Sequence, residues 1–106
     1  MDVRDVAKAH VLAITAPLAS NKRILLVSGV ITPQLIANTI RAKFPELKAR
    51  VEEGNAAQVF PDGVNSRGWD VSRSYEVFGK DWSYRGLEES VTDTVQDILR
   101  REPEEA

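Results

Sequence analysis

The apolar pattern of the chain changes in one stretch, residues 22–44, from a continuous run to positions at helical spacing. Ile24–Val27 is the continuous run, with two basic residues before it and a serine and a glycine after it. A short apolar run of this kind predicts a strand buried on both faces. Thr32 then predicts a helix N-cap, and Pro33 suits the first helical position because it lacks an N–H group.

The helix predicted after this start carries one apolar stripe. Ile36, Ile40 and Phe44 follow at every fourth position, and Pro45 ends the helix. A strand that leads into an amphipathic helix is half of an α/β unit and needs a sheet to sit in. The pattern therefore predicts an α/β fold with a small sheet.

Three further helices are predicted, which gives about four in total. The first spans Val3–Ala16 after a cap at Asp2. One of its faces carries Val3, Val6, Ala7, His10 and Ile14. His10 is therefore interpreted as a packed structural residue. A short helix, Val71–Phe78, follows a cap at Asp70 and ends at Gly79. The final helix spans Gly86–Arg101, with an apolar stripe and two arginines in its last turn.

Residues 47–68 form the least regular part of the chain, with several turn signals and no periodicity. Loops of this length are frequently binding loops. The apolar pair Val59-Phe60 has no periodic partner, so it is the candidate contact with a ligand, and Arg67 is the candidate for holding a carbonyl or anionic group. The alternatives are an aromatic core residue at Phe60 and a solvated surface arginine at Arg67.

Composition excludes several classes of function. The 106 residues allow one domain, and a net charge of −2 with scattered basic residues predicts no nucleic-acid partner. No apolar run approaches the roughly 18 residues of a membrane span. The absence of cysteine and the single histidine exclude thiolate and histidine-rich metal sites, and we expect a cytoplasmic protein without a metal. Residues 102–106 are expected to be a frayed acidic tail.

Several segments, taken in order, resemble landmarks of the extended short-chain dehydrogenases/reductases. The most similar branch is that of the fungal NADPH-dependent aldehyde and methylglyoxal reductases. The plant dihydroflavonol and cinnamoyl-CoA reductases are more distant relatives. They cover almost the whole chain: DVRDVAKAH from Asp2, RILLVSG from Arg23, FPEL from Phe44, WDVSR from Trp69, Phe78-Gly79 and LEESVTDTV from Leu87.

The resemblance is to the C-terminal third of that family, which is its substrate-binding lobe. The family's glycine-rich dinucleotide fingerprint and its Tyr-x-x-x-Lys helix have no counterpart among these residues. Tyr75 and Lys80 are five positions apart rather than four, and Gly79 lies between them, so they do not share a helical face. No catalytic or cofactor-binding residue is therefore assigned. Residues 1–101 are interpreted as a truncated substrate-binding lobe, with NADPH expected for the full-length family and not for this chain alone.

Three functions follow as hypotheses. The first is the C-terminal substrate-binding portion of an NADPH-dependent aldehyde or ketone reductase, which contacts a small carbonyl-containing or aromatic molecule and cannot transfer hydride by itself. The second is a non-catalytic interaction module, which forms a homo-oligomer or pairs with a missing N-terminal half. The third is a cofactor-free isomerase or cyclase that reuses the substrate pocket.

Overall fold

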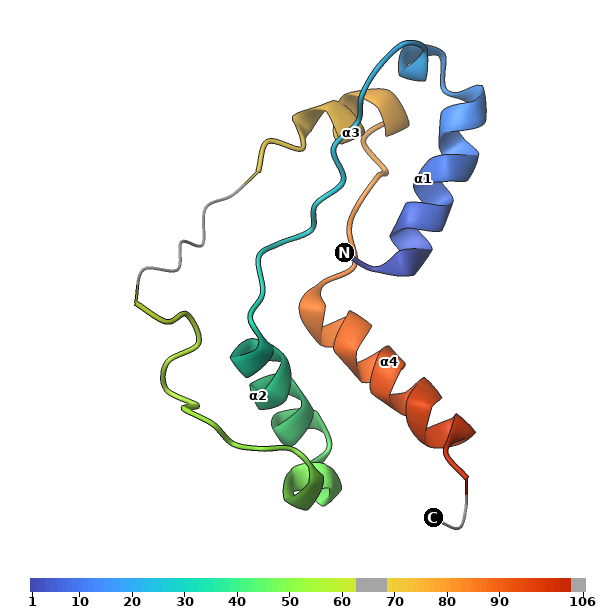
Figure 1. Ribbon diagram of the computed structural model, residues 1–106. Helices are drawn as coiled ribbons and strands as arrows, with labels where there is room; N and C mark the ends of the chain where they lie inside the picture. The colour runs from blue at the N-terminus through green and yellow to red at the C-terminus, as the bar shows by residue number, and fades with distance from the viewer. Residues whose placement is uncertain (63–68, 104–106) are drawn as a thin grey trace. The chain divides into compact units, whose positions relative to one another are not determined.

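The computed structural model describes residues 1–62 and 69–103 and shows four α-helices among them (Figure 1). These are α1 (Val3–Thr15), α2 (Pro33–Lys43), α3 (Ser72–Phe78) and α4 (Leu87–Arg101). Two 3₁₀ helices, η1 (Pro17–Ala19) and η2 (Pro45–Arg50), follow α1 and α2. No helix in the described part of the chain is long and apolar enough to cross a membrane. The four predicted helices are confirmed, each to within one residue at either end.

The predicted helix ends are also confirmed, with one adjustment. Asp2 Oδ1 accepts a hydrogen bond from the Arg4 N–H at 2.8 Å. Thr32 Oγ1 accepts one from the Leu35 N–H at 3.2 Å. Asp70 lies one residue before the N-cap of α3, and its carboxylate accepts from the Ser72 N–H at 3.0 Å. Gly79 ends α3 with a φ of +94°, a value that side chains disfavour.

The predicted sheet is wrong for the residues that the structure describes, since none of them lies in a strand. Residues 22–32 run without a turn or bend, as the predicted strand requires. No backbone–backbone hydrogen bond between described residues involves Ile24–Val27, however. A strand is stabilised by its ladder with a neighbour, and the described residues supply no neighbouring strand. The apolar run is therefore extended and unpaired.

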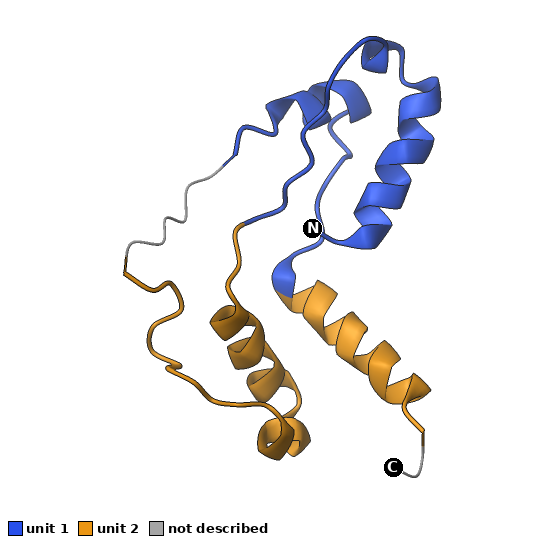
Figure 2. Ribbon diagram, viewed as in Figure 1, with its two compact units in different colours: residues 1–29, 67–87 blue, residues 30–66, 88–106 orange. Residues whose placement is uncertain are grey.

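The chain divides into two compact units, residues 1–29 with 67–87 and residues 30–66 with 88–106 (Figure 2). In the first unit, α1, η1 and α3 pack together. The aromatic rings of Phe78 and Tyr84 lie 4.8 and 5.3 Å from the ring of the buried Trp82. The Tyr84 hydroxyl donates to Ser74 Oγ at 2.8 Å, and Ser74 is fully buried. These three rings form a small aromatic core in the first unit.

The apolar face of α1 points to solvent. Val3 is 76% exposed and Ile14 is 83% exposed, whereas Asp5 and Ala9, on the opposite side, are buried. The prediction that His10 packs within the protein is wrong, because its side chain is exposed and its Nδ1 lies 2.8 Å from the Val6 carbonyl oxygen. This face of α1 is buried because the small Ala9 fits the interior of the unit and Asp5 is bonded to Arg85 there.

The buried carboxylate of Asp5 joins the two ends of this unit. Its Oδ2 accepts from the backbone N–H of Arg85 at 2.7 Å, and its Oδ1 accepts from the Arg85 guanidinium at 2.6 Å. The Asp5 side chain is 4% exposed and that of Arg85 is 35% exposed, so water screens the pair only in part. Hydrogen bonds to charged groups contribute more than neutral ones, so this contact holds α1 against the segment before α4.

Replacing Asp5 by asparagine is expected to destabilise the chain by about 1–3 kcal/mol, because the amide cannot accept both hydrogen bonds. Urea unfolding followed by tryptophan fluorescence measures the loss. Asp81 is exposed, so Asp81→Asn is the matched control and should leave the midpoint unchanged. Equal midpoints for the two variants would show that the buried contact contributes nothing.

In the second unit, α2 packs against η2. Phe44, the residue that connects the two helices, is buried. Ion pairs connect this part to α4 and its end. Lys43 pairs with Glu88, and the Arg50 guanidinium donates to Glu102 at 2.6 Å. The hydrogen bond from Arg50 lowers the pKa of Glu102, and the positive charge of the guanidinium lowers it further. Glu102 therefore has a partner within the segment expected to be a frayed tail, while residues 104–106 lie outside the described residues.

A carboxyl titration followed by NMR is expected to place the pKa of Glu102 below its ordinary value of 4.5. Because the pKa of Glu102 is lower in the folded chain than its ordinary value of 4.5, the ion pair stabilises the fold at pH values above 4.5. This contribution is lost as the pH falls through the folded-state pKa. Arg50→Gln should return the pKa of Glu102 to its ordinary value, and an unchanged titration in this variant would contradict the assignment.

Candidate functional site

The predicted ligand loop is held along one side of α2 by polar side chains of that helix. Gln34 Nε2 donates to the Glu53 carbonyl at 2.7 Å, and Gln34 Oε1 accepts from the Asn55 N–H at 3.0 Å. Asn38 Nδ2 donates to the Ala56 carbonyl at 3.1 Å. These bonds satisfy loop backbone groups that have no secondary structure to pair with. The middle of the loop is thereby fixed to the helix.

Two more side chains hold the loop on either side of these contacts. The Arg41 guanidinium donates to the carbonyls of Lys48 and Val51, at 3.0 and 2.7 Å. Thr32 Oγ1, besides capping α2, donates to the Val59 carbonyl at 2.6 Å. The apolar pattern of the sequence did not predict this role of α2. Its signal is the row of polar residues at helical spacing opposite the apolar stripe, namely Gln34, Asn38 and Arg41.

A glycine is required where the loop passes the glutamine. Gly54 has a φ of +60°, and a β-carbon there would lie 2.3 Å from Gln34 Oε1. The close approach of backbone to side chain thus explains the turn residue that the sequence shows at this position. A larger residue would be strained by this positive φ and would displace the amide end of the Gln34 side chain, which would break its bond to the loop.

Val59 and Phe60, two of the candidate ligand contacts, directly follow this anchored segment. Both are half-buried. The hydrogen bond from Thr32, the N-cap of α2, to the Val59 carbonyl holds the backbone of this pair beside the start of the helix. Arg67, the third candidate, lies outside the described residues. The structure therefore places the apolar pair on a held loop next to the N-terminus of α2, and its contact with a ligand stays a prediction.

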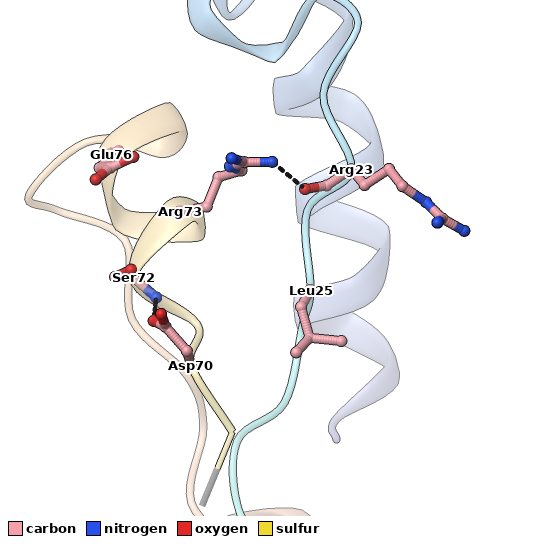
Figure 3. A pocket seen from close by; sticks show the side chains of 6 residues that line it. All are labelled: Arg23, Leu25, Asp70, Ser72, Arg73 and Glu76. Carbon is pink, nitrogen blue, oxygen red and sulfur yellow. Dashed lines mark hydrogen bonds between the residues drawn. The ribbon is translucent and has the colours of Figure 1, made fainter.

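A cavity of about 280 Å³ lies elsewhere, in the first unit, between the extended segment and α3 (Figure 3). Six residues line it: Arg23, Leu25, Asp70, Ser72, Arg73 and Glu76. The side chains of Arg23 and Glu76 point away from the space between the two segments, and that of Arg73 points across it. No pattern in the sequence predicted this cavity.

The charged groups of this cavity that point inward already have partners. The Arg73 guanidinium donates to the Arg23 carbonyl at 3.2 Å. The hydrogen bond from Ser72 lowers the pKa of Asp70. The Asp70 carboxylate is thus already bonded to the first residue of α3. Pockets for carbonyl-containing or aromatic ligands are lined mainly by apolar groups, and this lining is mostly charged. The cavity is therefore a polar groove next to the extended segment, unlike a substrate pocket.

The described residues contain no group of three or more histidine, cysteine, aspartate or glutamate side chains that could hold a metal ion. Across the whole sequence there is no glycine-rich turn at a strand–helix junction to bind a pyrophosphate.

Gln34→Ala is expected to release the middle of the loop while keeping α2, since alanine is the best helix former. Hydrogen exchange of the Asn55 amide should become at least tenfold faster, because its acceptor is lost. Gln96→Ala removes an exposed glutamine from α4 and serves as the control. Unchanged exchange at Asn55 would show that the loop is held by other contacts.

Curated reductases of fungi match nearly the whole chain. The ketoreductase azaE of Aspergillus niger is 37% identical over 101 residues, which are 95% of this chain and 29% of that protein. The NADPH-dependent methylglyoxal reductase of Saccharomyces cerevisiae is 28% identical over 102 residues, 96% of this chain and 29% of the relative. A comparison with models of protein families found no match.

A solved structure matches as well. The crystal structure of yeast methylglyoxal/isovaleraldehyde reductase Gre2 complexed with NADPH aligns with a TM-score of 0.78 and 28% sequence identity, over 94% of this chain and 32% of that one. The chain thus belongs to the extended short-chain dehydrogenases/reductases. It corresponds to their C-terminal lobe, in the branch of the fungal NADPH-dependent reductases, and spans about a third of the length of the relatives that it matches.

Proposed function

We propose that this chain is the substrate-binding portion of an NADPH-dependent aldehyde or ketone reductase, and that it transfers hydride only together with a nucleotide-binding half. The observation that carries the proposal is the match over nearly the whole chain to reductases of which it spans 29%. A pyrophosphate site and an acid–base group are both needed for the reaction, and neither motif occurs in these 106 residues.

The contribution of this chain to such a reaction is to shape the pocket of the carbonyl substrate. Reductases of this kind need the carbonyl carbon held close to the nicotinamide, since positioning supplies a large part of the rate. The loop of residues 51–62 is suited to this task because four side chains of the α2 segment fix its backbone. Val59 and Phe60 then offer apolar surface from a segment that loses little entropy on binding.

A chimaera tests this function. The matched C-terminal part of the yeast methylglyoxal reductase is replaced by this chain, and oxidation of NADPH is followed with methylglyoxal and with an aromatic aldehyde. Both substrates are expected to be reduced. Phe60→Ala should lower kcat/KM for the aromatic aldehyde about tenfold or more, because the ring contact is lost, and should change that for methylglyoxal less than about threefold.

The controls separate the parts of the proposal. Ile98→Ala, an exposed position on α4, should leave both substrates unaffected. The 106-residue chain alone should oxidise no NADPH with either substrate. A folded chimaera that binds NADPH and reduces neither carbonyl compound would refute the function. Equal effects of Phe60→Ala on both substrates would refute only the assignment of the ring to the aromatic substrate.

No feature of the described residues favours the cofactor-free isomerase or cyclase.

A further inference from the structure

A single buried hydroxyl joins the start of α2 to the loop. Thr32 is 8% exposed. Its Oγ1 accepts from the Leu35 N–H at 3.2 Å and donates to the Val59 carbonyl at 2.6 Å, a contact between residues 27 positions apart. A hydroxyl has one proton to donate, so the bond to the loop uses the only donor of this side chain. Because Thr32 is buried, water competes little for this bond.

The carbonyl that Thr32 holds belongs to the peptide unit between Val59 and Phe60. Since a peptide unit is planar, the bond fixes the plane from which the Phe60 backbone continues. Pro61 restricts the same residue from the other side, because its ring disfavours helical conformations at the residue before it. Phe60 is thus restrained by a hydrogen bond before it and by a proline after it. An aromatic residue with a restrained backbone loses little entropy when it binds a ligand.

We propose that Phe60 makes the pocket prefer carbonyl substrates that carry an aromatic ring, and that Thr32 and Pro61 are its positioning residues. The inference rests on the proposed function, in which the loop contacts the substrate. It deepens that function, because it names the class of substrate and two residues that act through the ring of a third. A ring held in one orientation can stack on an aromatic substrate or meet its edge, whereas a small aliphatic carbonyl compound gains little from it.

Two substitutions separate the two roles of the Thr32 hydroxyl. In Thr32→Asp the carboxylate still accepts from the first N–H groups of α2, since aspartate is a favourable N-cap, but it has no proton to donate to the Val59 carbonyl. Thr32→Ser keeps both the acceptor and the donor and is the conservative variant. Thr94→Asp makes the same change at an exposed position of α4 and controls for the added charge.

The first measurement is NMR relaxation of the backbone amides in the chain without any substrate. The order parameter of the Phe60 amide is expected at about 0.85 in the unaltered chain and in Thr32→Ser, and below about 0.6 in Thr32→Asp. The Leu35 amide should stay rigid in all three, because the cap is kept. A mobile Phe60 amide in the unaltered chain, or an unchanged order parameter in Thr32→Asp, would overturn the role of Thr32.

The second measurement is the kinetics of the chimaera with the aromatic aldehyde and with methylglyoxal. Thr32→Asp should raise KM for the aromatic aldehyde about three- to tenfold and change kcat less than about twofold, because a binding contact is weakened and the chemical step is not. KM for methylglyoxal should change less than about twofold. Pro61→Ala should have the same selective effect, since the Phe60 backbone gains freedom. Thr32→Ser should recover most of the loss, and Thr94→Asp should change neither KM.

The outcomes separate this inference from the proposed function. An equal rise of KM for both substrates, or a loosened Phe60 amide with an unchanged KM for the aromatic aldehyde, would overturn the inference, while an active chimaera would leave the proposed function intact. A chimaera that reduces neither carbonyl compound refutes the function and this preference together, and the relaxation data still decide whether Thr32 restrains the loop. Circular dichroism checks folding. If Thr32→Asp unfolds, Pro61→Ala decides through both measurements, because it removes no hydrogen bond.

Discussion

The carboxylate of Asp5 accepts hydrogen bonds from the backbone and the guanidinium of Arg85, a residue 80 positions further along the chain. Few apolar side chains in the described residues are buried, and they are Ala9, Phe44, Val77 and Trp82. With so small a core, contacts between distant segments depend on polar side chains that bond backbone groups. The same constraint recurs in the second unit, where Thr32, Gln34, Asn38 and Arg41 hold the loop.

This way of holding the chain is consistent with the proposed function, in which the chain works beside a nucleotide-binding half. A loop whose backbone is bonded to a helix presents Val59 and Phe60 without needing a deep core behind them. The relatives that the chain matches are reductases about three times its length. Under the proposed function, such a lobe supplies binding and positioning, and a nucleotide-binding half supplies the pyrophosphate site and the acid–base groups.

The extended segment after η1 shows how a correct local pattern can lead to the prediction of a sheet that the described residues do not form. Ile24–Val27 has the composition of a buried strand, and its backbone is extended as that composition predicts. A sheet, however, is a property of at least two segments, and the described residues hold no second one. The predicted small sheet is therefore absent from the described residues, although the alignment with a reductase structure supports the fold of the lobe to which the segment belongs.

Local signals by themselves determined the helices, since caps, proline positions and apolar spacing act within one turn. Thr32 with Pro33 marks the start of α2, and Gly79 marks the end of α3. Motifs such as WDVSR also determined the family. Only the tertiary structure decided which face of α1 is buried, because Asp5 and Ala9 find partners in the first unit and Val3 and Ile14 do not. It likewise decided that the polar side of α2 holds the loop, since a side chain and a backbone group 18 or more positions apart meet only after folding.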